Sequence, residues 1–228
     1  MPRGRHLVRI KAKPLDPTVA QKYWLDWDAK ALRRDPGMFP PLTSPALFGN
    51  RRPLEVEIGS GSGEYLVALA SHNPETNFLG IEVSFRSATF AATLASKAEL
   101  DNLRILRANF KLLYPNLQAD SWARVYLHFP DPVHRREDRK RNLFTAEFLD
   151  AMASTLLPGG ELSVASDKPE FFFAMLELAE GDNRFEKVHT ERYLEGLETP
   201  VKSRFQRFWE RKGIGPLRFV VRRRALRG

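Results

Sequence analysis

Short apolar runs alternate with longer amphipathic stretches over most of this chain, beginning at Leu54. The short runs are typical of strands, which they predict at 54–58, 77–83, 103–109, 123–129 and 159–166. Between them, apolar residues recur at helical spacing, which predicts helices at 64–72, 85–100, 142–156 and 169–181. Two last runs, 185–190 and 217–223, are expected to pair as strands, because no adequate helix separates them.

Strands that alternate with helices in this way indicate an α/β fold. We expect a doubly wound, Rossmann-like sheet that is mostly parallel, is covered on both faces and has an antiparallel C-terminal strand. Before this pattern starts, residues 1–50 are rich in proline and basic residues, with one helix-compatible stretch, Thr18–Arg33. The chain is therefore divided into a basic N-terminal arm, residues 1–50, which wraps the domain or contacts a ligand, and a folded domain, residues 51–228.

The composition is that of a folded protein with a substantial core, because 43% of the 228 residues are hydrophobic and 28% are charged. The absence of cysteine excludes disulfide scaffolds, cysteine-based zinc ribbons, thiol nucleophiles and iron–sulfur ligation. Five scattered histidines do not suggest a zinc site, and we expect no metal. No apolar run approaches the ~18 residues of a membrane span, and the N-terminus does not resemble a signal peptide. We expect a cytoplasmic monomer or homodimer with no membrane partner.

The formal net charge of +8 is distributed unevenly along the chain. Residues 1–52 carry a net +7, residues 53–131 a net −3, and residues 132–228 a net +4. The excess favours an anionic partner such as nucleic acid, although the basic residues of the arm are as readily explained as a solvated surface. In the last third, basic residues gather at 134–142 and 202–228. The first group directly follows a strand and a Pro-Asp-Pro turn, where ligands bind in open α/β sheets.

A glycine-rich segment, Glu57–Gly63, follows the first strand of the folded domain. Glycines such as Gly59 and Gly61 allow a tight turn and the close approach of a ligand, and the next helix begins with unpaired N–H groups. Glu82, 19 residues past Gly63, ends the second strand and is placed to accept hydrogen bonds from two ribose hydroxyls. The two features predict a nucleoside site. The alternative is a glycine turn without a ligand.

The acidic residue in front of the glycines bears on which nucleoside cofactor binds. Dinucleotide sites read G-x-G-x-x-G, whereas here Glu57 precedes the letters G-S-G-S-G. A carboxylate at this position repels a pyrophosphate and accepts a hydrogen bond from an α-ammonium group, which favours S-adenosylmethionine over NAD. Asn109, at the end of the third strand, is placed near an adenine edge, or it is an ordinary strand-end asparagine.

Asp131 lies in a rigid turn after the fourth strand of the domain. Pro130 and Pro132 flank it and restrict the backbone, which holds its carboxylate at the mouth of the sheet. The alternative is a turn with a capping aspartate. That alternative does not explain why five Lys or Arg residues follow within ten positions.

These motifs, in this order, closely resemble those of the bacterial tRNA (guanine-N7)-methyltransferase family, whose members are class I S-adenosylmethionine-dependent methyltransferases. The matching segments are VEIGSGSGEYLVALA, FLGIEVS, LHFPDPVHRREDRKRN, LPGGELSVASDKPEF and KSRFQRFWERKGIG. They run from about residue 54 to the end, and the third is fairly specific, because a Pro-Asp-Pro turn before a basic loop is rare among methyltransferases. The resemblance implies methyl transfer to N7 of a guanine in tRNA, at position 46 of the variable loop.

The resemblance also implies roles for single residues. The cofactor would be bound by Glu57, Gly59, Gly61, Glu82, Asn109 and Asp131, with Asp131 as the catalytic residue. The substrate would be bound by Arg135, Asp167, Ser203, Arg204, Phe205 and Gln206. RNA would be contacted by Arg136, Glu137, Asp138, Arg139, Lys140, Arg141 and Asn142.

The sequence departs from the family pattern at several positions. The family usually has Trp where this chain has Val133, Lys at Arg135, His at Asp138 and Asp at Asn109. Its C-terminal Thr-x-x-Glu motif reads S-R-F-Q here, ending at Gln206. An amide at that position can still pair with a guanine edge, but it cannot attract a proton as a carboxylate does.

Guanine N7 carries an in-plane lone pair, so its methylation requires alignment more than a strong base. We expect Asp131 and Asp167 to hold the base edge-on, with N7 facing the methyl group. Two alternatives stay open. A methyltransferase for another RNA or a non-RNA substrate shares the cofactor site, although a small-molecule or protein substrate would not need the basic loop. A non-catalytic RNA-binding module leaves Glu57, Glu82 and Asp131 without a purpose.

Overall fold

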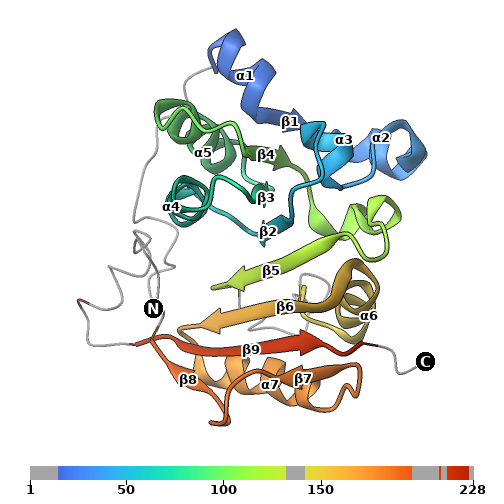
Figure 1. Ribbon diagram of the computed structural model, residues 1–228, viewed down its shortest axis with the longest axis vertical. Helices are drawn as coiled ribbons and strands as arrows, with labels where there is room; N and C mark the ends of the chain where they lie inside the picture. The colour runs from blue at the N-terminus through green and yellow to red at the C-terminus, as the bar shows by residue number, and fades with distance from the viewer. Residues whose placement is uncertain (1–14, 132–141, 197–210, 212–214, 226–228) are drawn as a thin grey trace.

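The computed structural model describes residues 15–131, 142–196, 211 and 215–225, and all structural statements concern these residues. They form a mixed sheet with helices on both faces, which confirms the predicted α/β class (Figure 1). The order of its nine described strands is β1-β4-β3-β2-β5-β6-β9-β7, with β8 beside β9. Pairing is parallel from β1 to β6, whereas β9 runs antiparallel to β6, β7 and β8, as expected for the C-terminal strand.

The strands follow the apolar runs closely, because a parallel strand covered on both faces reads as a nearly continuous apolar segment. The parallel strands are β1 (Trp24–Asp26), β2 (Leu54–Ile58), β3 (Asn77–Glu82), β4 (Leu103–Arg107), β5 (Trp122–His128) and β6 (Leu156–Ser166). The other strands are β7 (Phe185–Lys187), β8 (Leu194–Glu195) and β9 (Leu217–Arg223). The predicted pairing of the last two runs is confirmed by the β7–β9 ladder.

The helices divide between the two faces of the sheet. One face is covered by α1 (Pro17–Tyr23), α4 (Glu64–His72) and α5 (Phe85–Lys97). The other face is covered by α2 (Ala29–Arg34), α3 (Ser44–Phe48), α6 (Ala146–Thr155) and α7 (Pro169–Glu180). Three 3₁₀ turns complete the described elements, η2 (Pro36–Met38), η3 (Phe110–Leu112) and η4 (Tyr114–Asn116). Each face therefore has its own buried apolar cluster.

The expectation of one helix over Thr18–Arg33 is wrong. Helix α1 ends at Tyr23, and Trp24–Asp26 then pairs in parallel with β4 as strand β1. A new helix begins after Asp28, whose carboxylate accepts hydrogen bonds from the backbone N–H groups of the first turn of α2. A strand of three residues is too short to interrupt a helical hydrophobic pattern, so the two short helices on either side of it read as one.

Residues 15–50 are packed closely against the rest of the protein. Tyr23, Trp27, Leu32 and Leu42 are all buried, and β1 extends the sheet by one strand. Trp122 donates from Nε1 to the backbone oxygen of Leu42 at 2.7 Å, which ties this segment to β5. Residues 1–14 of the predicted arm lie outside the described residues.

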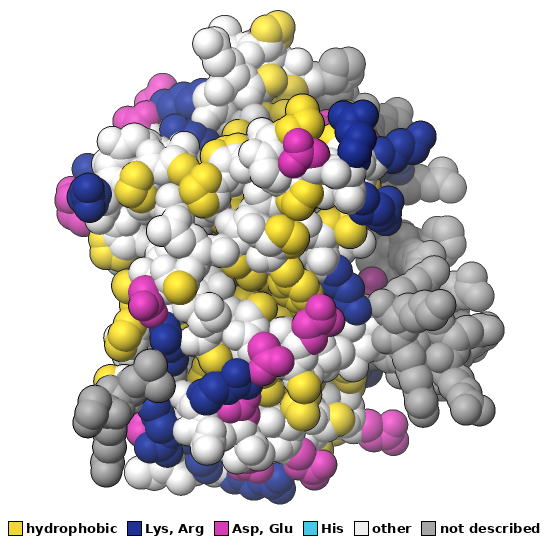
Figure 2. Space-filling view, turned by 90° about the vertical axis from the view of Figure 1, so that its right-hand side faces the viewer, with side chains coloured by type: hydrophobic (Ala, Val, Ile, Leu, Met, Phe, Trp, Pro, Cys, Tyr) yellow, Lys and Arg dark blue, Asp and Glu magenta, His cyan; other side chains and the backbone are white. Residues whose placement is uncertain are grey.

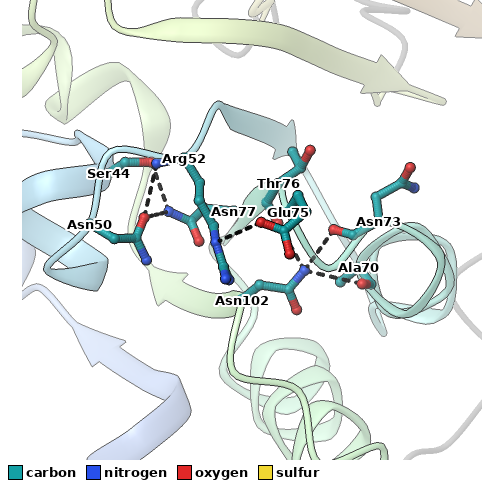
Figure 3. Close-up of polar contacts among 9 residues, drawn as sticks. All are labelled: Ser44, Asn50, Arg52, Ala70, Asn73, Glu75, Thr76, Asn77 and Asn102. Atoms are coloured by element: carbon teal, nitrogen blue, oxygen red, sulfur yellow. Dashed lines mark hydrogen bonds and ion pairs between the residues drawn. The ribbon is translucent and has the colours of Figure 1, made fainter.

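Buried asparagines fasten the loops at the amino-terminal edge of the parallel strands (Figure 3). Asn102 donates from Nδ2 to three carbonyl oxygens at the end of α4 and in the loop after it, those of Ala70, Asn73 and Thr76, at 3.1, 3.0 and 2.8 Å. Asn77 donates to Ser44 Oγ at 2.9 Å and to Asn50 Oδ1 at 2.6 Å. The Asn102 bonds fix the far end of α4, and the near end of that helix carries the glycine-rich loop. The Asn77 bonds tie the start of β3 to α3 and to the loop after it.

Candidate functional site

Five strand ends that carry predicted site residues meet at one edge of the sheet, because the carboxyl ends of parallel strands lie together. In register, Ile58 of β2 is opposite Ile81 of β3, and His128 of β5 is opposite Ala165 of β6. The predicted site residues at these strand ends, or within three residues after them, are Gly59, Gly61, Glu82, Asn109, Asp131 and Asp167. Residues that lie far apart in the sequence are thus brought to one edge. Glu57 lies in β2 one residue before its end, near enough to Glu82 and Glu64 for their charges to act on it.

The glycine-rich loop adopts a backbone that requires glycine. Gly59, Gly61 and Gly63 have φ angles of +79°, +55° and +78°, in the left-handed region that other residues seldom adopt. A Cβ at Gly59 or Gly61 would meet nothing within 4 Å, whereas a Cβ at Gly63 would lie 2.6 Å from that of Ala91. The first two glycines therefore leave space in front of the backbone, and the third allows α4 to approach α5.

Glu57 is a buried carboxylate without a full set of partners. It is 5% exposed, and its Oε2 accepts no hydrogen bond within the described part of the chain. Burial raises its pKa well above the usual value, and the carboxylates of Glu82 and Glu64 raise that pKa further. An unpaired buried carboxylate costs stability, and a cationic group of a ligand would offset that cost.

Glu82 holds the glycine loop in place. Its Oε2 accepts a hydrogen bond from the backbone N–H of Gly61 at 2.9 Å, and its Oε1 accepts from that of Ser84 at 2.7 Å. A carboxylate has about four lone-pair sites, so each oxygen can still accept from a hydroxyl. Asn109 is exposed, and its Oδ1 accepts from the N–H of Lys111 at 3.1 Å, which begins η3.

The chain turns sharply between the end of β5 and Asp131. Phe129 has a φ of +54°, which is uncommon for a bulky residue, and its N–H donates to the carbonyl of Ala165 at 2.8 Å. Asp131 is exposed. On the neighbouring strand end, the Asp167 side chain is 7% exposed and forms an ion pair with Lys168 at 3.2 Å. The two aspartates therefore follow adjacent strands, one in solvent and one sheltered.

A layer of polar and aromatic side chains behind the edge was not predicted. His128 packs against the rings of Tyr65 and Tyr126, with centroids 5.2 and 5.5 Å away, and its Nε2 is 3.1 Å from Ser163 Oγ. Burial, together with the charge of Arg218, lowers the pKa of His128 to about 3, so this imidazole is neutral at physiological pH. A sequence signal existed, because polar residues alternate with apolar ones along β5.

Many predicted substrate and RNA residues lie outside the described residues. These are Arg135, Arg136, Glu137, Asp138, Arg139, Lys140, Arg141, Ser203, Arg204, Phe205 and Gln206. Asn142 is described, is half-buried, and has an Oδ1 without a hydrogen-bond partner. The roles predicted for Asn142 and for these other residues stay predictions.

A surface hollow of about 680 Å³ lies at the opposite edge of the sheet, where β9 ends beside the start of β6. It is lined by Ala153, Asn183, Arg184, Glu186, Arg223, Arg224 and Ala225. Its arginines already have acidic partners, since Arg184 pairs with Asp150 and Asp182, and Arg224 pairs with Glu186. The glycine-loop edge is the better candidate site, because it holds a buried carboxyl group whose Oε2 has no partner among the described residues, and open space.

Neither a cluster of metal ligands nor a helix suited to a bilayer occurs among the described residues. No group of three or more His, Asp or Glu side chains there has an arrangement that would hold a metal ion. In the same part of the chain, no helix combines the length and apolar character that crossing a bilayer requires.

Residues 51–216 match the model of a protein family described as "Putative methyltransferase". A tRNA (guanine-N(7)-)-methyltransferase of Rubrobacter xylanophilus is 43% identical over 217 residues, which cover 95% of this chain and 97% of the relative. The enzyme of the same name from Chloroherpeton thalassium is 37% identical over 219 residues, covering 96% and 97%.

Solved structures share the fold at lower identity. The 16S rRNA methyltransferase KamB superposes with a TM-score of 0.54 at 19% identity, over 78% of this chain and 91% of that protein. TrmN from Thermus thermophilus superposes with a TM-score of 0.53 at 22% identity, over 86% of this chain. The chain spans only 48% of the length of TrmN.

Proposed function

Because this chain belongs to the tRNA (guanine-N7)-methyltransferase family, we propose that it transfers a methyl group from S-adenosylmethionine to N7 of a guanine in tRNA. The target within the tRNA is position 46 of the variable loop. The observation that carries the cofactor assignment is the buried, unpartnered carboxylate of Glu57 beside the open glycine loop. This combination suits a ligand with cationic groups and does not suit a pyrophosphate.

The residues at the glycine-loop edge fit the parts of such a cofactor. Glu57 is proposed to accept a hydrogen bond from the α-ammonium group, which would give its buried Oε2 a partner. Glu82 is proposed to accept from the ribose hydroxyls while it holds the N–H of Gly61. Gly59 and Gly61 leave room at the backbone, and Asn109 has an Nδ2 group with no described partner that can meet the adenine edge.

The chemical step places modest demands on the protein. S-adenosylmethionine, when bound, supplies an electrophilic methyl group on a positively charged sulfur. Guanine N7 attacks with its own lone pair, so the side chains align the purine and need not take a proton from it. Asp131 and Asp167 are proposed to hold the base edge-on and to favour the positive charge that develops on it. His128, whose pKa is lowered to about 3, is a weak proton acceptor, which is consistent with a reaction that needs no general base.

The remaining assignments follow the same proposal. Arg135 and residues 203–206 are proposed to bind the target nucleotide, and residues 136–142 to contact the RNA backbone. We propose that residues 51–228 form the methyltransferase domain, that residues 1–50 form a basic arm, and that the protein acts in the cytoplasm as a monomer or homodimer without a metal.

The test is methyl transfer to unmodified tRNA. The purified protein is incubated with S-adenosylmethionine carrying a labelled methyl group and with an unmodified tRNA transcript, and the nucleosides of the product are identified by mass spectrometry. A matched transcript in which the guanine at position 46 is replaced by adenine is the control. The proposal expects 7-methylguanosine from the first transcript and none from the second.

Other results would replace the proposal with a named alternative. A different methylated nucleoside would indicate another RNA methyltransferase activity. Binding of tRNA without any incorporation would indicate an RNA-binding module. Labelling of both transcripts would overturn position 46 while leaving guanine-N7 transfer in place.

A further inference from the structure

The short helix α2 presents one basic face to solvent. Lys30, Arg33 and Arg34 are exposed, and their spacing of i, i+3 and i+4 places them side by side on the helix. Leu32 points the other way and is buried in the core. None of the three cations forms an ion pair within the described part of the chain. The face therefore carries three positive charges that have no ion-pair partner among the described residues.

This contrasts with three arginines at the far end of the sheet. Arg184, Arg192 and Arg224 each lie beside a carboxylate, at N–O distances of 2.7, 3.0 and 3.1 Å. An exposed ion pair contributes little to stability, but it neutralises a charge that would otherwise attract an anion. Only the unpaired group remains fully available to a polyanionic partner.

Helix α2 lies at the edge of the sheet that holds the candidate active site. Strand β1 is parallel to β4 and ends at Asp26, opposite Arg107. The N–H of Trp27 donates to the carbonyl of Arg107 at 3.2 Å, two residues before Asn109. Helix α2 begins at Ala29, two residues after Trp27. Figure 2 shows the side of the molecule on which α2 lies. Lys and Arg side chains gather at the upper right of that view.

We propose that the basic face of α2, Lys30, Arg33 and Arg34, binds backbone phosphates of the tRNA away from the target nucleotide. The proposal rests on the proposed function. Four strand-to-strand steps separate β1 from β5, which carries Asp131, and at about 4.8 Å per step this is roughly 19 Å. That span is too long for one nucleotide to bridge, so the face serves a long RNA and not the isolated base.

A lipid surface does not fit this face as well. Membrane-surface helices need an apolar side for insertion beside their basic side, and the apolar Leu32 of α2 is already used in the core. Phosphates on a nucleic acid backbone require only cations at the surface. We therefore commit to RNA as the partner.

The experiment compares tRNA affinity at several salt concentrations for wild type and the triple variant Lys30→Ala, Arg33→Ala, Arg34→Ala. Alanine is the best helix former, so α2 and its Asp28 cap should persist. We expect the dissociation constant for tRNA to rise about tenfold at moderate salt. The slope of log affinity against log salt should become shallower by about 2 to 3. Affinity for S-adenosylmethionine should not change.

Two further variants separate local charge from general effects. The triple variant Arg184→Ala, Arg192→Ala, Arg224→Ala removes the same net charge from the far end of the sheet, where each cation already lies beside a carboxylate, and should leave tRNA affinity unchanged. Lys30→Arg with Arg33→Lys and Arg34→Lys keeps the charges and should keep the affinity. Equal losses in the two alanine triples, or an unchanged salt slope for the α2 triple, would overturn the proposal.

Binding and methylation are measured separately, so the two proposals can fail separately. A wild type that binds tRNA with a steep salt slope and does not methylate it would overturn the proposed function only. Methylation of tRNA by the wild type, together with a tRNA affinity that the α2 substitutions do not change, would overturn this inference only. Protection of α2 from hydrogen exchange by a protein and not by tRNA would also overturn it.

Discussion

The substitution Gly63→Ala tests the role assigned to the third glycine of the loop, the packing of α4 against α5. An alanine there must adopt a φ near +78°, which costs about 1–2 kcal/mol for a residue with a Cβ. Its Cβ would also lie 2.6 Å from the Cβ of Ala91, and overpacking of this kind costs about 1–3 kcal/mol. The free energy of unfolding should therefore fall by about 2–5 kcal/mol, a large part of a typical total of about 5–15 kcal/mol.

The matched control is Gly59→Ala. Gly59 has nearly the same φ, +79°, and a Cβ there would meet nothing within 4 Å. It should lose only the backbone part, about 1–2 kcal/mol. The difference between the two variants isolates the contact with Ala91. Urea denaturation followed by far-UV circular dichroism gives both values, provided that the m-values agree.

A second-site change then tests the contact directly. Ala91→Gly alone should destabilise the protein by about 1 kcal/mol, because it places a glycine within α5. In the double variant it should restore part of what Gly63→Ala loses, and only part, because the Cα of residue 91 remains 3.1 Å away. A double-mutant cycle with no coupling, or equal losses for Gly63→Ala and Gly59→Ala, would refute the packing argument.

Three other substitutions have expected outcomes. Glu57→Gln should weaken binding of S-adenosylmethionine and stabilise the free protein by about 1–3 kcal/mol. The pKa of Glu57 is raised in the folded protein, so wild type is most stable below the unfolded pKa of about 4.3 and loses stability as pH rises through the folded pKa. The gain from Gln should therefore grow with pH in thermal unfolding, and a gain that shrinks would contradict the assignment. Asp131→Asn should lower kcat for methyl transfer by at least tenfold with tRNA affinity, from filter binding, almost unchanged; retained activity would remove Asp131 from the catalytic role. Asn102→Ala leaves three carbonyls without their donor and should lower the free energy of unfolding, measured by chemical denaturation, by about 2–4 kcal/mol. Asn73→Ala, at an exposed site, should lower it by under about 1 kcal/mol. Similar losses for the two variants would argue against the network.

The hydrophobic pattern predicted the sheet well where strands are long and buried. Strands β2 to β6 each bury most of their residues, so their apolar runs are unambiguous. The pattern failed at β1 and β8, which have three and two residues, too few for a period to be recognised. These strands form because they pair with β4 and β9, and the residues within each strand do not indicate such long-range pairing.

The candidate site was predictable where the chemistry depends on residue type and order along the chain. The sequence alone indicated three of the site residues: Glu57 before the glycines, Glu82 at the next strand end and Asp131 between prolines. The different roles of the three glycines could not be predicted, because the role of Gly63 depends on its distance from Ala91, which lies on another helix. The low pKa of His128 likewise follows from its packing against Tyr65 and Tyr126 and from the nearby charge of Arg218, which only the fold brings together.

The two edges of the sheet have a consequence for how copies of this protein can associate. The edge strands on the main path are β1 and β7, and each has only three residues. Unpaired backbone N–H and C=O groups on a long edge strand invite pairing with another molecule, and very short edge strands suppress it. Two copies joined through these edges would form a ladder of three residues at most. A homodimer of this chain would therefore be built from side chains on its helices and loops, and the sheet would not continue from one subunit into the next.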